Sequence, residues 1–167
     1  MARLEKSRKY ICDAMMMLLK KKKYDDITIN DIVNKAGVSR MTFYRQFYDK
    51  KEIIRAMIEE RTDDYLSRIK GTKVTRELLV LSFEALIASK DFTRRIIEAD
   101  LYNLSKEQFD KVVAVFIKDG YKAFFISGGI ANIYYRYIIN NDNYTAEELT
   151  DILLDMLNLD DFNKDNN

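Results

Sequence analysis

The sequence predicts an all-α protein of about nine helices, and three observations support this fold class. Proline is absent from the 167 residues, so no position lacks the backbone N–H group that a helix interior needs. Apolar residues recur three and four positions apart along most of the chain, as they do on the buried face of a helix. No segment forms a convincing strand pattern. We therefore expect helices throughout, joined by glycine turns and polar caps.

The first helical pattern keeps its apolar residues on one face and ends at a run of four lysines, residues 20–23. The residues of that face are Leu4, Ile11, Met15, Leu18 and Leu19. Positive side chains at this end complement the negative pole of the helix dipole. The lysines are therefore interpreted first as a solvated helix end, with contact to phosphate as the alternative.

Two short helices are predicted between residues 28 and 47. Thr28 and Asp31 have the spacing of a cap at the start of the first one. Gly37 ends that helix, because glycine adopts a positive φ without a Cβ clash. Its buried stripe is Ile29, Ile32, Val33 and Ala36. Ser39 then caps the second short helix, which buries Phe43 and Phe47.

Six more helices are expected after these three. The fourth helix starts at Asp49 and Glu52 and runs to about Lys70, before Gly71. The others cover residues 74–89, a short segment after Asp91, a segment capped by Ser105 and Gln108, residues 121–139 after a turn at Gly120, and a last segment capped by Thr145 and Glu148.

The composition excludes several classes of function. Histidine is absent and Cys12 is the single cysteine, which excludes a Ser-His-Asp triad, a histidine-ligated metal and an intramolecular disulfide. The glycines lack the spacing of a phosphate-binding loop, so we expect no enzyme, no cofactor and no metal. The longest apolar run, residues 123–135, is too short to span a bilayer. With no signal-peptide pattern at the N-terminus, we expect a cytoplasmic protein without a membrane partner.

The small net charge of +1 conceals an asymmetry. Residues 1–57 carry 14 Lys/Arg against 7 Asp/Glu, a net charge of +7. Residues 58–167 carry 14 against 20, a net charge of −6. A basic N-terminal module on an acidic body indicates a polyanionic partner for the first part of the chain, although ordinary surface charge would explain the same numbers.

Residues 28–53 have the form of a helix-turn-helix, a motif that places its second helix in the major groove of DNA. Ala36 is small enough for the two helices to approach, and Gly37 makes the sharp turn. Ser39 caps the helix whose first residues would face the base edges. The solvent face of this helix is predicted to carry Arg40, Met41, Thr42, Tyr44 and Arg45.

The segment resembles the TetR family of bacterial transcriptional regulators over residues of about 8 to 58. The matching residues are Thr28, Ile32, Val33, Ala36, Gly37, Val38, Ser39, Thr42, Phe43, Tyr44, Phe47, Lys51 and Glu52, with Lys50 just before the last two. Many members have glycine where this chain has Met41, which leaves the base preference at that position open. The rest of the chain is similar to short members of the family, including regulators linked to dihydroxyacetone kinase operons.

The resemblance implies a set of DNA contacts. Arg40 or Arg45 would read guanine through O6 and N7, and which of them does so stays open. Thr42 and Tyr44 would donate to phosphate oxygens. Thr28 and Lys50 lie at helix N-termini, where a phosphate is favoured, although Thr28 is also explained as a plain cap. The candidate set is Thr28, Ser39, Arg40, Met41, Thr42, Tyr44, Arg45, Gln46 and Lys50.

The resemblance also implies two domains: residues 1–50 as a three-helix DNA-binding domain and residues 51–167 as a helical regulatory and dimerisation domain. A homodimer would bind a palindromic operator in double-stranded DNA, usually as a repressor. The two glycines in the long helix and the apolar stripe of the last helix suggest the dimer face. The candidates are Gly128, Gly129, Leu149, Ile152, Leu153 and Met156, although packing within one chain would also explain them.

A small-molecule effector or a partner protein at the C-terminal domain would change the affinity for DNA. Aromatic side chains are the candidate lining of an effector pocket, although core and dimer packing explain them as well. These candidates are Phe83, Tyr102, Phe116 and Tyr121. Only 96 residues follow Gly71, so a large pocket is not expected. The alternative function is a co-regulator or interaction module that is controlled by a protein partner and binds no small-molecule ligand.

Overall fold

The computed structural model describes residues 2–163, without the side chains of residues 2–4, 161 and 163. The predicted apolar position Leu4 therefore lies outside the described side chains, as do residues 1 and 164–167 of the two predicted domains. Within residues 2–163 the fold is all-α, with ten helices and no strand. They are α1 (Ala2–Leu19), α2 (Ile29–Ala36), α3 (Arg40–Gln46), α4 (Lys50–Ile69), α5 (Arg76–Ala88), α6 (Lys90–Glu98), α7 (Tyr102–Phe116), α8 (Gly120–Asn140), α9 (Ala146–Met156) and α10 (Asp160–Asn163).

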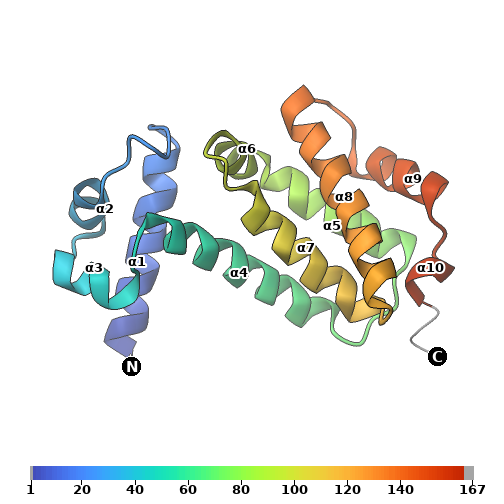
Figure 1. Ribbon diagram of the computed structural model, residues 1–167, viewed down its shortest axis with the longest axis horizontal. Helices are drawn as coiled ribbons and strands as arrows, with labels where there is room; N and C mark the ends of the chain where they lie inside the picture. Colours follow the sequence, from blue (N-terminus) through green and yellow to red (C-terminus); the bar gives the residue numbers. More distant parts are fainter. Residues whose placement is uncertain (1, 164–167) are drawn as a thin grey trace.

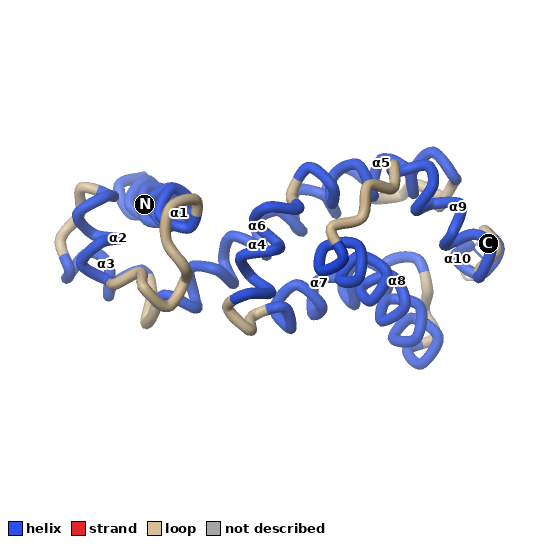
Figure 2. Tube along the Cα trace, turned by 90° about the horizontal axis from the view of Figure 1, so that it is seen from above, coloured by secondary structure: helices blue, strands red, loops and turns tan. Residues whose placement is uncertain are grey.

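The molecule is elongated and has two parts, which we name the head (α1–α3) and the body (α5–α10) (Figure 1). Helix α4 leaves the head and runs along the body, where it packs on α7. Seen from above, the head stands at one end of the molecule, with α4 and α6 next to it (Figure 2). The predicted arrangement of an N-terminal helix-turn-helix and a C-terminal helical body is confirmed.

The helices of the head begin and end at the caps that the sequence predicts. The Thr28 hydroxyl accepts a hydrogen bond from the Asp31 amide (3.1 Å), and the Asp31 carboxylate accepts one from the Thr28 amide (2.9 Å). Gly37 has a φ of 66°, the left-handed conformation that ends α2. Ser39 caps α3 through the Thr42 amide (3.1 Å). These local bonds set where α2 begins and ends and where α3 begins.

The core of the head extends beyond its own three helices. Ile53, Ile54 and Ile58 of α4 are buried in the same cluster as the apolar stripes of α1, α2 and α3. Ile96 of α6 and Leu104 of α7 are buried there too. Helix α4 and the nearby end of the body therefore pack against the head, and the first core does not end at the predicted boundary after residue 50.

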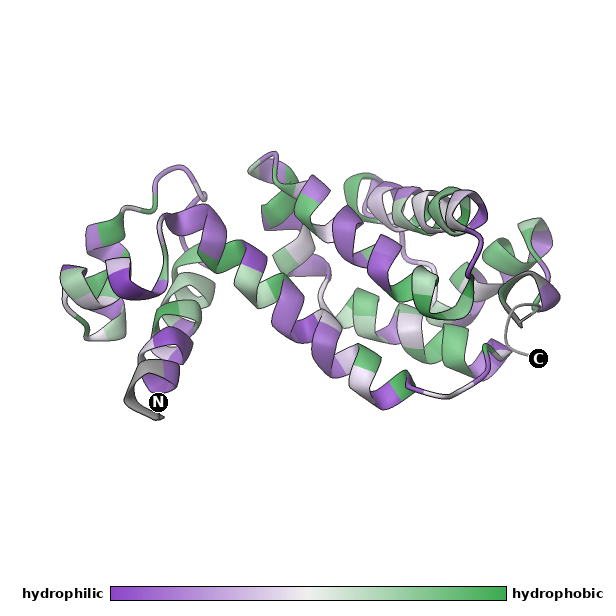
Figure 3. Cartoon of the chain, turned by 60° about the horizontal axis from the view of Figure 1, so that its bottom comes forward, coloured by the Kyte–Doolittle hydropathy of each residue, from purple (hydrophilic) through white to green (hydrophobic). Residues whose placement is uncertain are grey.

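The body has a second core, built mainly from α5, α7, α8 and α9. Tyr134 of α8 is buried in it, and its hydroxyl donates to the carbonyl of Leu86 (2.7 Å) and lies 3.1 Å from the Thr93 hydroxyl. Hydrophilic and hydrophobic residues alternate along the helices (Figure 3). No helix within residues 2–163 is long and apolar enough to cross a membrane.

One predicted helix start and one predicted glycine turn in the body are wrong. Helix α7 begins at Tyr102, so Ser105 and Gln108 lie inside the helix and do not cap it. The chain turns earlier because Asp100 takes a positive φ of 55° and Leu101 is buried in the core of the head. Gly120 does not make a turn with a positive φ; it is the first residue of α8, which is capped by the Asp119 carboxylate.

Candidate nucleic-acid interface and body cavity

Helix α3 presents one face to solvent and buries the other. Phe43 and Phe47 are buried against α1 and α2, as the sequence predicts. Arg40, Tyr44 and Arg45 are exposed, and Thr42 and Gln46 are half-buried. Met41 is 80% exposed. The exposed face therefore groups the candidate contacts of α3 on one side of a short, firmly anchored helix.

The two arginines of α3 make no salt bridge within residues 2–163, so neither charge is neutralised by the described protein side chains. The Tyr44 ring packs edge-on against the Phe43 ring, with 5.3 Å between the centroids, and remains 52% exposed. Tyr44 is anchored at its ring, and α3 thus carries an exposed tyrosine together with two exposed arginines that have no acidic partner among the described side chains. This set of donors suits phosphate oxygens and guanine edges.

Thr28 is occupied as a cap. Its amide and hydroxyl both bond the Asp31 carboxylate, which also accepts from Lys22 (3.0 Å). The bond from the Thr28 amide, followed by the bond from Lys22, lowers the pKa of Asp31 to about 2. A carboxylate that stays ionised already fills the N-terminal end of α2, and a phosphate there would meet a like charge. This geometry favours capping over phosphate binding for Thr28.

Lys50 is also engaged within the protein. Its ammonium donates to the carbonyls of Tyr24 (2.7 Å), Ile27 (3.1 Å) and Asp25 (3.3 Å). It also lies 4.3 Å from the centroid of the Tyr24 ring. An ammonium has three donors, and these carbonyls use all of them. Lys50 therefore ties the loop between α1 and α2 to the start of α4, an arrangement we name the Lys50 clamp.

Two residues beside α3 were not in the predicted contact set. Tyr48 directly follows the helix and is 81% exposed. Arg8 of α1 lies over the Phe47 ring, with its guanidinium carbon 4.7 Å from the centroid, and so reaches the end of α3. For Arg8, the sequence signal of a possible DNA contact was the basic run Lys6, Arg8 and Lys9. Both extend the polar and aromatic surface around α3.

The body contains a cavity of about 380 Å³ between α4, α5, α6 and α7, with contributions from α8, α9 and α10. Phe83 and Phe116 line it, as predicted. Tyr102 and Tyr121 do not line it, so these two pocket predictions are wrong. The Tyr102 hydroxyl donates to the Ala131 carbonyl (2.6 Å), and Tyr121 lies at the start of α8 with 93% of its side chain exposed. The volume is at the small end of ligand pockets, in keeping with a small body.

The predicted dimer residues fall into two groups. Gly128 and Gly129 lie in α8 with open space where a Cβ would be, and Met156 of α9 is exposed. Leu149 and Leu153 are buried within the chain, where α9 packs on α5, so they are core residues. Ile152 is half-buried. Their burial corrects the idea that the whole apolar stripe of α9 forms a free face.

A cluster of exposed aromatic side chains on α8 was not identified from the sequence. Phe124 and Phe125 are exposed one turn after Tyr121. Tyr121, Phe125 and Gly129 are spaced four residues apart, so they lie on one side of α8. The spacing is visible in the sequence, which suggested Tyr121 for a pocket and Gly129 for the dimer face.

Comparison with known proteins links the head to a family. The model of a family described as "Bacterial regulatory proteins, tetR family" matches residues 11–57. The uncharacterized HTH-type transcriptional regulator YvkB of Bacillus subtilis (strain 168) is 34% identical over 67 residues. That alignment covers 40% of this chain and 35% of YvkB, so it spans about a third of the length of this curated relative.

A solved structure is similar to this protein over most of the chain. The dihydroxyacetone kinase operon activator DhaS superposes with a TM-score of 0.65 and 20% sequence identity, covering 90% of this chain and 93% of that one. At this identity the likeness is one of fold, and it extends through the body. The sequence match therefore links residues 11–57 to the tetR family of bacterial regulatory proteins, and the fold match extends through the body.

Proposed function

We propose that the protein is a transcriptional regulator that binds double-stranded DNA with α3 in the major groove. The observation that carries this proposal is the exposed face of α3, where Arg40 and Arg45 have no acidic partner within residues 2–163. Either arginine can donate two hydrogen bonds to a guanine edge. The net charge of +7 on residues 1–57 adds attraction to the phosphates.

The other candidate residues have different roles in this proposal. Ser39, Met41, Thr42, Tyr44 and Gln46 contact the groove walls or base edges around the arginines. Thr28 and Lys50 act indirectly. Thr28 caps α2, and Lys50 holds the start of α4 against the loop between α1 and α2. We therefore assign them the positioning of α3 and no direct phosphate bond.

The regulator is proposed to act as a homodimer, with residues 1–50 as the DNA-binding domain and residues 51–167 as the regulatory and dimerisation domain. The face of α8 that carries Tyr121, Phe125, Gly128 and Gly129 supports a second copy as its partner. Large exposed aromatic rings beside small residues allow two helices to pack closely. Two heads related by a two-fold axis would read half-sites about 34–36 Å apart, or a multiple of that distance, in a palindromic operator.

The body is proposed to control the heads through α4. This helix starts at the Lys50 clamp, contributes Ile58 to the core of the head, and contributes Arg61 and Tyr65 to the cavity wall. Salt bridges from Arg55 to Glu107 (2.8 Å) and from Lys111 to Glu59 (3.9 Å) join it to α7. An effector that shifts α4 would change the separation of the heads. Repression is the proposed outcome when the heads occupy the operator.

Selection from a random library of duplex DNA tests this function. The purified protein should enrich sequences with two inverted half-sites, because a symmetric dimer presents α3 twice. Light scattering on the same sample should give the mass of two chains. If no sequence is enriched and duplex binding shows no salt dependence, the proposed function is wrong.

A second function is supported by the same aromatic face of α8. If the protein is a monomer in solution, Tyr121, Phe124 and Phe125 would be available to a different protein. The molecule would then be a co-regulator controlled by a partner protein. The mass of the DNA-free protein separates the two, because a second copy already covers that face in a dimer.

A further inference from the structure

The cavity of the body has mostly apolar walls. Helix α5 contributes Leu78, Leu79, Phe83 and Leu86, and α7 contributes Phe109, Val112, Val113 and Phe116. Its volume of about 380 Å³ corresponds to roughly a dozen groups the size of a water molecule, at about 30 Å³ each. A small apolar molecule would exchange water for these walls, which is the main driving force for such ligands.

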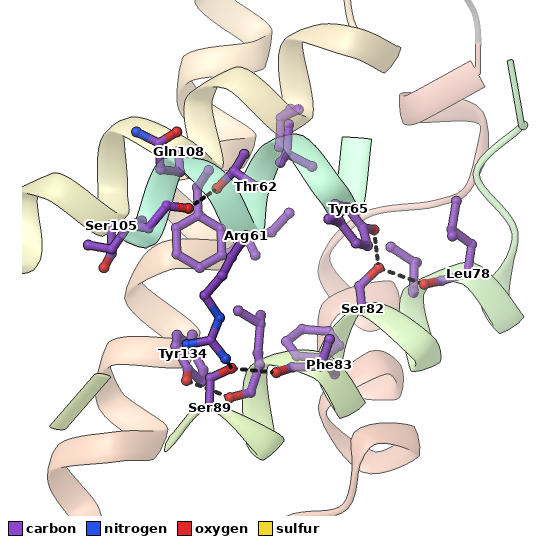
Figure 4. A pocket seen from close by; sticks show the side chains of 18 of the residues that line it. Arg61, Thr62, Tyr65, Leu78, Ser82, Phe83, Ser89, Ser105, Gln108 and Tyr134 are labelled. Atoms are coloured by element: carbon purple, nitrogen blue, oxygen red, sulfur yellow. Dashed lines mark hydrogen bonds between the residues drawn. The ribbon is translucent and has the colours of Figure 1, made fainter. Parts of the chain in front are cut away.

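One charged group in the wall, the exposed Arg61, has no acidic partner among the described residues. Arg61 extends from α4 across the cavity toward Ser89 and Tyr134 (Figure 4). Its guanidinium donates to the Ser89 hydroxyl (2.8 Å) and lies 5.5 Å from the centroid of the Phe92 ring. Within residues 2–163 it has no carboxylate partner. Four of its five N–H donors are therefore left for another acceptor.

A second arginine in the wall makes a useful contrast. Arg68, two turns further along α4, bonds the carboxylate of Asp64 on the same helix. Arg55, two turns before Arg61, is paired with Glu107 of α7. Arg55 and Arg68 each pair with a carboxylate, whereas the partners of Arg61 within the described residues, Ser89 and Phe92, are both neutral. An anion entering the cavity would therefore find its charge partner at Arg61.

The wall also holds a buried acceptor without a donor. Gln108 of α7 is 5% exposed and lines the cavity, and its Oε1 atom has no hydrogen-bond partner within the described structure. Burying an unpaired amide oxygen costs free energy. That oxygen has almost no accessible surface, so it does not face the open space of the cavity. The cavity thus combines apolar walls with one charged group, Arg61, that has no acidic partner among the described residues, and a few polar groups in apolar walls are the usual make-up of a binding site.

We propose that the cavity binds an apolar monocarboxylate, with its carboxylate on Arg61 and its hydrocarbon part between α5 and α7. The proposal rests on the function above, since it names the effector of that regulator. A guanidinium holds a carboxylate through two parallel hydrogen bonds, which a single serine hydroxyl does not match. The carboxylate would replace Ser89 as the partner of Arg61.

Replacement of that bond has a consequence for the head. The bond between Arg61 and Ser89 joins α4 to the junction of α5 and α6. Its loss frees the middle of α4 from that junction, and the start of α4 carries the Lys50 clamp. A ligand that binds the two arrangements of α4 with different affinity changes the affinity for DNA by the same ratio.

Calorimetric titration with octanoate and with 1-octanol tests the proposal on the full-length protein. Octanoate should bind at least about tenfold more tightly, because charge-assisted hydrogen bonds contribute more than neutral ones. Arg61→Met should abolish this preference and leave 1-octanol binding unchanged. Arg61→Lys should retain part of it, because a lysine keeps the charge without the two parallel donors. Arg55→Met, the matched control on the same helix, should bind both ligands as the wild type does.

Equal binding of octanoate by the wild type and Arg61→Met would overturn the proposal, and so would equal binding of octanoate and 1-octanol. Circular dichroism of each variant checks that it folds, and Arg61→Lys keeps the test open if Arg61→Met does not. DNA binding without ligand is measured separately. A protein that binds selected duplex DNA but not octanoate would remain a regulator with a different effector. A protein that binds octanoate but no duplex would keep the cavity assignment and lose the proposed function.

Discussion

The head and the body of this protein use their side chains in opposite ways. The head buries Phe43 and Phe47 so that its polar residues can face outward on a rigid, seven-residue helix. The body keeps a cavity with mostly apolar walls, and the polar group that matters most there, the exposed Arg61, lies across it. The contrast shows why the sequence is more informative about the head. An exposed recognition face is encoded by local caps and spacing, whereas a cavity depends on how distant helices pack.

The largest expected effect comes from the packing of the two cores. Phe43→Ala should lower the free energy of unfolding by about 3–5 kcal/mol, because it empties a fully packed site. Phe83→Ala should cost clearly less, since Phe83 borders a cavity and has fewer atoms packed on that side. Chemical denaturation of both variants measures the difference. Equal losses would mean that the cavity is closed by side chains in solution.

The Lys50 clamp is expected to have the next largest effect. Lys50→Met should destabilise the protein by about 1–3 kcal/mol, because three backbone carbonyls lose their donor. The salt dependence of duplex binding should keep its slope, since we assign no phosphate bond to Lys50. Lys51→Met, at an exposed neighbouring position, is the control for stability. If the slope of the salt dependence became smaller by about one unit in Lys50→Met and not in Lys51→Met, Lys50 would be shown to contact a phosphate.

Two glycines give the smallest effects, with opposite signs. Gly37→Ala should cost about 1–2 kcal/mol, because alanine resists the left-handed conformation at the turn between α2 and α3. Gly129→Ala should stabilise the isolated chain by about 0.5–1 kcal/mol, because Gly129 lies inside α8 with open space around it.

In the proposed dimer, however, the added methyl group at Gly129 should weaken association. Denaturation at low protein concentration measures the first effect, and sedimentation measures the second. If Gly129→Ala associates as strongly as the wild type, Gly129 does not lie in the interface.

The same contrast explains which parts of the fold can be predicted from the sequence. The caps at Thr28 and Ser39 and the turn at Gly37 depend on residues within four positions, and all three are confirmed. Ser105 and Gln108 have the same spacing as a cap but lie inside α7, because Leu101 is drawn into the core of the head and the helix starts earlier. A local pattern does not reveal that tertiary contact.

The candidate sites divide in the same way. The exposed set on α3 follows from the period of one helix, which the spacing of Phe43 and Phe47 establishes. The contacts of Lys50 join residues that are 23 to 26 positions apart, and the cavity combines side chains from seven helices. Leu149 and Leu153 looked available for a dimer, and only the packing of α9 on α5 assigns them to the core.

The central claim is that the exposed face of α3 binds DNA while the body does not. Fluorescence anisotropy with a selected palindromic duplex at several salt concentrations measures it most directly. Arg45→Ala should weaken binding by about 1–3 kcal/mol and leave the unfolding temperature unchanged, because Arg45 is exposed. Arg68→Ala, at the far end of α4, should bind as the wild type does. Wild-type affinity in Arg45→Ala, Arg40→Ala and Tyr44→Ala alike would contradict the account.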